Sequence, residues 1–146
     1  MTKIYYAHPM SWYGTHGEAL DLVGLASEGE VINPNTPYFQ TRVLIAQQNS
    51  TPVMQVFADF ICSPKCDVVA FRRFNDGKIG AGVAREIFEA LIWGKEVWEI
   101  RNIYGGDQLI DKALQLDNQP DGMIDIVLGD ILTVEETRRR CKEGIL

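Results

Sequence analysis

The chain has 146 residues, of which 46% are hydrophobic, and its formal net charge at pH 7 is -6. This length predicts one domain, residues 1–146, with a single core, and no apolar run reaches the roughly 18 residues of a membrane span. An acidic chain lacks the positive field that holds a nucleic acid polymer, so DNA and RNA are excluded as expected partners. Three cysteines, with no signal-peptide pattern at the start, favour a reducing, cytoplasmic compartment.

Strand-like and helical segments alternate through the first half of the chain. Prolines close the predicted strands, and the Thr-Pro pairs at 36–37 and 51–52 are typical helix starts, with a hydroxyl at the N-cap and proline at the first helical position. The predicted elements are a strand at 3–7, a helix at 19–26, a strand at 31–34 and helices at 38–48 and 53–61.

The second half of the chain continues this alternation. Asp67-Val-Val-Ala-Phe71 is an almost continuous apolar run, which is typical of a strand buried on both faces of a parallel sheet. Thr133-Val-Glu-Glu136 has the form of a capping box, so a last helix is expected through Cys141. The other predicted elements are a helix at 83–93, a strand at 96–100, a helix at 107–116 and a fifth strand at 124–128.

Strands that alternate with helices predict an α/β fold, here a flavodoxin-like or Rossmann-like three-layer sandwich with a parallel five-stranded sheet. In such folds, ligands bind beyond the carboxyl ends of the strands. The loops at 8–15, 33–36 and 72–82 are expected to meet at that edge. Candidate functional residues are therefore sought in and beside these loops.

Glu86 is the carboxylate in the most unusual predicted place. It flanks the apolar stripe of the helix at 83–93, and it is close enough to the predicted helix start for the dipole to keep it ionised. An ionised, half-buried carboxylate at the mouth of a parallel sheet can attack an electrophilic carbon and leave again. A simpler interpretation stays open, because glutamate is common in the first turn of helices.

Three sets of motifs occur in an order typical of one enzyme family. The family's opening strand and turn are written I-Y-x-A-G-P, and the chain has the similar run Ile4-Tyr-Tyr-Ala-His-Pro9. The family also has an aspartate followed eight residues later by a D-V-V-A segment, and the chain has Asp59 followed by Asp67-Val-Val-Ala70. A family helix written G-T-A-x-E-I-G-x-A is similar to Gly82-Val-Ala-Arg-Glu86-Ile-Phe-Glu-Ala90. The G-K-x-V strand that follows it in the family is similar to Gly94-Lys95-Glu-Val97. By these motifs the chain resembles the nucleoside 2-deoxyribosyltransferase-like superfamily of deoxyribosyltransferases and deoxynucleoside monophosphate N-glycosidases.

The resemblance implies a chemistry and the residues that perform it. Glu86 matches the nucleophile that forms a covalent glycosyl-enzyme, Tyr5 matches the tyrosine that orients it, and Asp59 matches an aspartate near the leaving base. The implied function is cleavage or transfer of the N-glycosidic bond of a nucleoside, deoxynucleoside or 5′-monophosphate, in a retaining two-step reaction. No cofactor is implied, and relatives of this kind are commonly homo-oligomers.

The motifs also depart from the family pattern. The family often has an aspartate six residues before its nucleophile, where this chain has Gly80, and Asp76 is the candidate substitute. His8 stands where the family has glycine, and Val83 where it has threonine. The identity of the base stays open for these reasons.

Further substrate-binding candidates lie in the loops at the same edge of the sheet. Arg72 follows the third predicted strand directly, and its forked donors suit a 5′-phosphate if the side chain does not point into water. His8, in its neutral form, is suited either to bonding a base or sugar or to closing a turn. The other candidates are Ser11 for a phosphate, Trp12 for stacking on a base, Asp76 and Gly82.

Other classes of site and function were weighed against this one. Cys62 and Cys66 have the spacing of half a zinc site, but both histidines lie far upstream, so no metal is expected. A non-catalytic nucleotide-binding or sensing domain of the same fold remains an alternative. A flavodoxin-like FMN protein is a weaker one, because Ser11-Trp-Tyr-Gly-Thr15 fits poorly to the T/S-x-T-G-x-T loop of that class.

Overall fold

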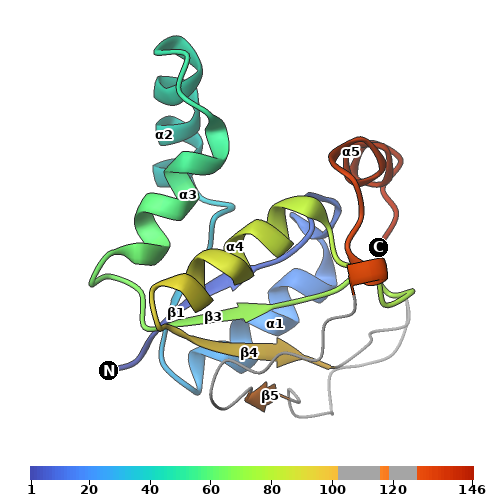
Figure 1. The fold of residues 1–146 in the computed structure, drawn as a ribbon. Coiled ribbons are helices and arrows are strands. Elements are labelled where there is room, and N and C mark those ends of the chain that lie inside the picture. The colour runs from blue at the N-terminus through green and yellow to red at the C-terminus, as the bar shows by residue number, and fades with distance from the viewer. Residues whose placement is uncertain (102–115, 119–127) are drawn as a thin grey trace.

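A computed structural model describes residues 1–101, 116–118 and 128–146. Its centre is a sheet in the order β2-β1-β3-β4-β5 (Figure 1). The strands are β1 (Lys3–Ala7), β2 (Glu30–Ile32), β3 (Val68–Phe71), β4 (Glu96–Ile100) and β5 (Leu116–Asn118). The helices are α1 (His16–Ala26), α2 (Pro37–Gln48), α3 (Val53–Cys62), α4 (Ala81–Ile92) and α5 (Val134–Lys142), with short 3-10 helices η1 (Met10–Trp12) and η3 (Leu128–Asp130).

The direction of the strands confirms part of the predicted fold. β2, β1, β3 and β4 run parallel to one another, as expected for an α/β fold with a parallel sheet. The prediction of five parallel strands is wrong, because β5 pairs antiparallel with β4. Strand direction depends on the path by which the chain returns to the sheet, and hydrophobic periodicity carries no information on that path.

Two predicted elements fall largely outside the described residues. The expected helix at 107–116 lies there except for Leu116, which is the first residue of β5. The expected strand at 124–128 also lies there except for Leu128, which begins η3. The structure therefore tests only the ends of these two predictions.

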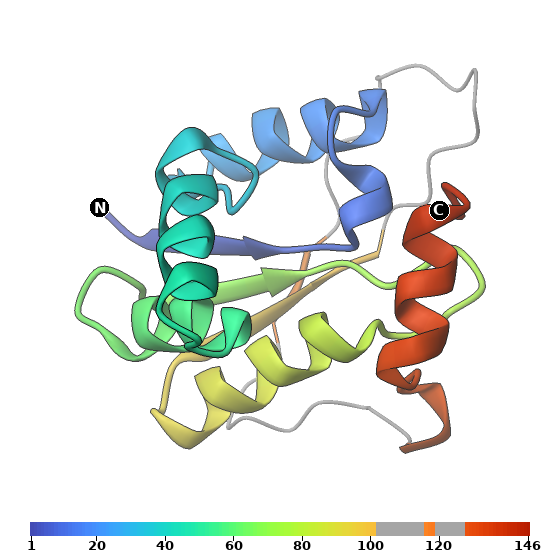
Figure 2. The same cartoon turned by 90° about the horizontal axis from the view of Figure 1, so that it is seen from above.

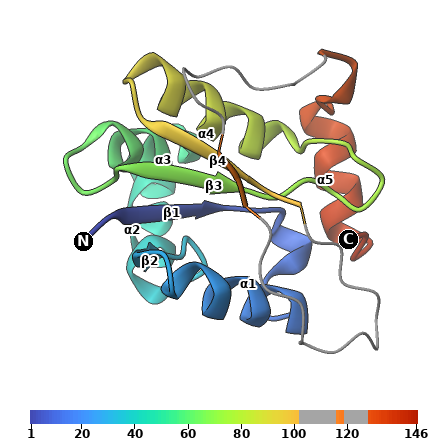
Figure 3. The same ribbon diagram turned by 90° about the horizontal axis from the view of Figure 1, so that it is seen from below.

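The core occupies both faces of the sheet. Successive side chains of a strand point to opposite faces, so Tyr5 packs on one side with α2, α3 and α4, whereas Tyr6 packs on the other side with α1. Figure 3 shows α1 and α4 on opposite sides of the strands. All of β3 is buried, which confirms the prediction made from its apolar run. The three-layer arrangement follows from these two cores.

Two parts of the chain stand away from the central layers. α2 and α3 lie side by side and extend above one face of the sheet, and α5 lies near the carboxyl ends of β1 and β3 (Figures 1 and 2). α5 is thus placed at the edge where ligands bind in folds of this kind, and α2 and α3 lie over the neighbouring face of the sheet (Figure 2). Within the described ranges, no helix is both long enough and apolar enough to span a membrane.

Candidate functional site

A cavity of about 680 Å³ lies over the carboxyl end of β1. Its walls come from β1 and the loop behind it, from α2 and α3, from the first half of α4 and from α5. Strand order reverses between β1 and β3, so the cavity lies beside the point where α/β sheets usually bind ligands. Its volume is within the range of small-molecule sites, about 300–1,000 Å³.

Glu86 projects from α4 into the wall of this cavity and is only 8% exposed. Burial raises the pKa of its carboxyl to about 8, against a smaller lowering by the nearby Tyr5 hydroxyl. The prediction that the helix dipole keeps Glu86 ionised is therefore wrong for the free protein. The helix begins at Ala81, so Glu86 lies in the second turn, where the dipole acts weakly and burial outweighs it.

Tyr5 lines the same cavity from β1. Its ring is held by edge contacts with Phe39, at 6.2 Å between centroids, and by Phe60. The hydroxyl lies close enough to Glu86 for each group to affect the pKa of the other, but it completes no hydrogen bond of normal geometry in the described part of the chain. A buried, unsatisfied hydroxyl costs about 1–3 kcal/mol, so a ligand or a small movement of Glu86 that satisfies it is favoured.

Tyr13 brings a second phenol to the cavity. Burial, and then the charges of Glu86 and Glu18, raise the pKa of its hydroxyl well above the usual value. Its ring lies 4.9 Å from that of His8. Tyr13 lies in the loop at 8–15 that was expected at this edge of the sheet, but no local pattern indicated that it lies close to Glu86.

His8 also lines the cavity, but both of its ring nitrogens are already bonded within the protein. Nδ1 lies 3.0 Å from the Tyr6 carbonyl oxygen and Nε2 lies 2.8 Å from the Glu18 carboxylate. A carbonyl only accepts, so Nδ1 carries a hydrogen and donates it. Burial tends to raise the pKa of Glu18, but bonds from His8 and from the Gly14 N–H hold that pKa below its usual value. A ligand therefore meets the carbon edge of this ring.

Arg72 is engaged on the other face of the sheet and is 2% exposed. Its Nε and Nη2 donate to the Asp21 carboxylate at 2.6 and 2.7 Å, and its guanidinium lies 4.5 Å from the centre of the Trp12 ring. The Tyr6 hydroxyl donates to the same carboxylate. The described residues that line the cavity do not include Arg72, Trp12 or Ser11, whose hydroxyl oxygen is buried.

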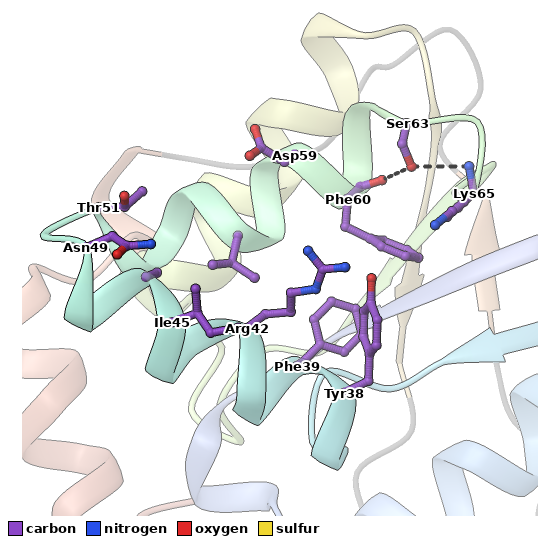
Figure 4. A pocket seen from close by; sticks show the side chains of 12 residues that line it. Tyr38, Phe39, Arg42, Ile45, Asn49, Thr51, Asp59, Phe60, Ser63 and Lys65 are labelled. Atoms are coloured by element: carbon purple, nitrogen blue, oxygen red, sulfur yellow. Dashed lines mark hydrogen bonds between the residues drawn. The ribbon is translucent and has the colours of Figure 1, made fainter.

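The two aspartates expected at the site lie elsewhere. Asp59 is exposed on α3, accepts a bond from Gln55 at 2.6 Å, and borders a separate groove of about 390 Å³ between α2 and α3 (Figure 4). Asp76 pairs with Arg140 at 2.9 Å, and this bond holds the pKa of Asp76 below its usual value. Of the sequence-derived site residues, the cavity therefore brings together Tyr5, His8, Gly82 and Glu86.

α5 was not among the segments expected at this site. Thr137, Arg138 and Cys141 of that helix line the cavity. Thr137 and Cys141 are one turn apart on the least charged face of an otherwise highly charged helix. This spacing was the one feature of the sequence from which packing of that face against the protein could have been predicted. The predicted start of the helix was correct, since the Thr133 side chain accepts from the Glu136 N–H at 3.1 Å, but the Glu136 carboxylate is bonded to Arg139 and Arg140. The motif could not show where the helix packs.

The wall of the cavity suits an organic molecule better than a metal ion. Most of its lining is apolar, including Phe39, Leu44, Met54 and Phe57. Among the residues that the structure describes, no cluster of three His, Cys, Asp or Glu side chains is placed to hold a metal. The arrangement provides one buried carboxyl, two phenols and an apolar enclosure.

No protein-family model matches this chain, and no curated protein matches it. The interpretation of the cavity therefore rests on its own geometry and on the motifs of the sequence.

Proposed function

We propose that the protein cleaves or transfers the N-glycosidic bond of a nucleoside or nucleotide, with Glu86 as the nucleophile. The observation that carries this proposal is the proximity of Glu86 and Tyr5 in the wall of an apolar cavity at the carboxyl end of β1. The ordered motifs around Tyr5 and Glu86 support it independently, because they resemble the nucleophile helix and first strand of glycosidic-bond enzymes.

The reaction has two displacements at one carbon. A carboxylate oxygen of Glu86 attacks the anomeric carbon, and the carbon–nitrogen bond breaks as the base leaves with the electron pair and takes up a proton. The sugar is then an ester of Glu86. Water attacks the same carbon from the opposite side, gives its proton to solvent, and releases Glu86 as a carboxylate. A second base in place of water gives a new nucleoside.

The environment of Glu86 suits this reaction. Glu86 must lose its proton before it attacks, and the positive charge that develops on the sugar stabilises the carboxylate. Once Glu86 is ionised, a small movement lets the Tyr5 hydroxyl donate to the carboxylate, which fits its lowering effect on the pKa of Glu86. The lining of the cavity is mostly apolar, so the attraction between the carboxylate and the developing charge is less screened than in bulk water.

A base-release assay tests the proposal. The protein is incubated with a panel of nucleosides, deoxynucleosides and their 5′-monophosphates, and free base is measured by chromatography. We expect release by the wild type, its loss in Glu86→Gln, and its retention in Glu89→Gln, which changes a second glutamate of α4 that does not line the cavity. Absence of release across the panel contradicts the proposal. Adding a second base as acceptor distinguishes transfer from hydrolysis.

A second candidate is a nucleotide-binding or sensing domain without turnover. The position of Asp59 favours it, because the resemblance assigns this residue to the leaving base and the side chain borders a different groove. In that case a compound of the same panel binds saturably to the wild type, and no free base is released from it.

A further inference from the structure

Two exposed apolar side chains line the cavity. Met10, on η1, is 67% exposed, and Leu44, in the middle of α2, is 59% exposed. A single exposed methionine or leucine is ordinary on a protein surface. These two come from separate elements and belong to one concave lining. The other residues that α2 and α3 contribute to it are apolar apart from two glutamines, and are Phe39, Gln40, Val43, Gln47, Val53, Met54 and Phe57.

The polar groups that the cavity offers to a ligand are few. The Tyr5 hydroxyl is fully buried and completes no hydrogen bond of normal geometry within the described ranges, and the buried carboxyl of Glu86 lies near it. The Tyr13 phenol lines the same cavity. A ligand is therefore favoured if it brings a polar group to Tyr5 and Glu86.

Other polar side chains of the lining are already bonded or reach water. Both ring nitrogens of His8 are used within the protein. The Thr137 hydroxyl donates to a carbonyl of its own helix at 2.8 Å and accepts from the first N–H of α4 at 2.9 Å. The Gln40 amide donates within the protein at 3.4 Å. Gln47 and Arg138 are exposed, so water can satisfy them.

A ligand that fills this cavity needs both a polar and an apolar surface. A polar group buried against an apolar wall loses its hydrogen bonds to water, whereas an apolar group gains free energy roughly in proportion to the area it buries. We propose that the ligand is an amphipathic nucleoside, with an apolar substituent of several carbon atoms in contact with Met10, Leu44 and the adjoining wall from α2 and α3. This inference rests on the proposed function, because the reaction at Glu86 makes the polar part of the ligand a nucleoside.

Binding is measured without turnover in the Glu86→Gln chain. Two alkyl series, from methyl to butyl, are titrated by calorimetry against their unsubstituted parents. One series carries the chain on the base, as N6-alkyl deoxyadenosines and 5-alkyl deoxyuridines, and the other carries it on the sugar, as 5′-O-alkyl ethers of the same nucleosides. In one series we expect affinity to rise about 2- to 4-fold for each added methylene, because each is removed from water. The series that gains shows which part of the nucleoside carries the substituent.

Leu44 and Ile45 provide a matched pair of variants. Both are exposed aliphatic side chains of α2, at 59% and 48%, but Leu44 lines the cavity and Ile45 lines the separate groove between α2 and α3. In Leu44→Asn we expect the butyl compound to bind about 3- to 10-fold more weakly and the unsubstituted parent to bind as before. Met10→Gln should act in the same way, and Ile45→Asn should keep the full gain. Circular dichroism checks that these surface variants are folded.

The outcomes separate this inference from the proposed reaction. Constant affinity along both series, no binding of any compound, or a gain that Leu44→Asn leaves intact overturns the inference. A wild-type dimer that Leu44→Asn dissociates in sedimentation also overturns it, because a second copy then covers this wall. If the wild type releases base from unsubstituted nucleosides and no series gains affinity, the reaction stands without the apolar substituent. If affinity rises along a series but the wild type releases no base, the apolar site stands and the reaction fails.

Discussion

Arg72 and Asp21 form a buried ion pair with two hydrogen bonds that joins the end of β3 to α1. Trp12 covers the guanidinium, and the Tyr6 hydroxyl donates to the carboxylate from β1. Side chains of β1, η1 and α1 thus meet the end of the distant strand β3 beside the loop that begins at His8. We infer that this network holds the β1 end of the cavity in place.

Replacing Asp21 by Asn should destabilise the fold strongly. The substitution removes the charge that offsets the buried Arg72 guanidinium, and breaking such a pair from one side typically costs about 3–5 kcal/mol. Urea unfolding followed by circular dichroism measures the effect. Glu136→Gln, which weakens an exposed pair on α5, is the control and should change the midpoint little. An unchanged midpoint for Asp21→Asn contradicts a structural role for this pair.

Glu86 should make the protein less stable as the pH rises. The pKa of about 8 in the folded state lies above the ordinary value of 4.5, so between these values the folded state keeps a proton that the unfolded state releases. Stability then falls as the pH rises through this window, by about 1.4 kcal/mol for each unit of pKa shift. Unfolding free energies from urea titrations at a series of pH values should show this fall in the wild type and not in Glu86→Gln. Equal slopes for the two proteins would refute it.

The rate of base release should rise with pH. Only the ionised carboxylate attacks, so kcat/KM for the free protein is expected to increase with an inflection near pH 8, the pKa of Glu86. Initial rates at constant ionic strength over the whole range of stability measure the profile. A rate that falls above this pH indicates that Glu86 donates a proton, which contradicts its role as nucleophile.

Tyr5→Phe should shift that profile. The Tyr5 hydroxyl lowers the pKa of Glu86, so its loss moves the inflection to higher pH and reduces the rate at neutral pH. If Tyr5 serves only to pack against Phe39, the Tyr5→Phe protein keeps the inflection of the pH–rate profile at the wild-type pH, because phenylalanine preserves that packing. Tyr38→Phe, on an exposed ring of α2 outside the cavity, serves as the control.

Gly17→Ala should destabilise the packing under Trp12. A Cβ at position 17 would lie 2.1 Å from the Trp12 ring, which Arg72 covers from another side, so the ring or α1 must shift. Overpacking of this kind costs about 1–3 kcal/mol, and urea unfolding measures it. At Gly129 a Cβ meets no described residue within 4 Å, so Gly129→Ala should leave the midpoint almost unchanged.

Local patterns predicted the elements of this fold better than their assembly. The apolar run at 67–71 and the capping box at Thr133 both describe interactions between near neighbours in sequence, and both correspond to observed elements. The engagement of Arg72 by Asp21 joins two distant elements, and no local pattern encodes which face of the sheet the arginine takes. The same reason explains why the antiparallel direction of β5 and the contribution of α5 to the cavity were not predicted.

The cavity has walls from four separate regions of the chain, of which α2, α3 and α5 stand outside the central layers. A molecule that fills it joins these regions and is lost when they separate, so it should raise the melting temperature in proportion to the logarithm of its concentration well above Kd. Thermal-shift screening of metabolite libraries can therefore find the natural ligand without any assumption about the chemistry of Glu86.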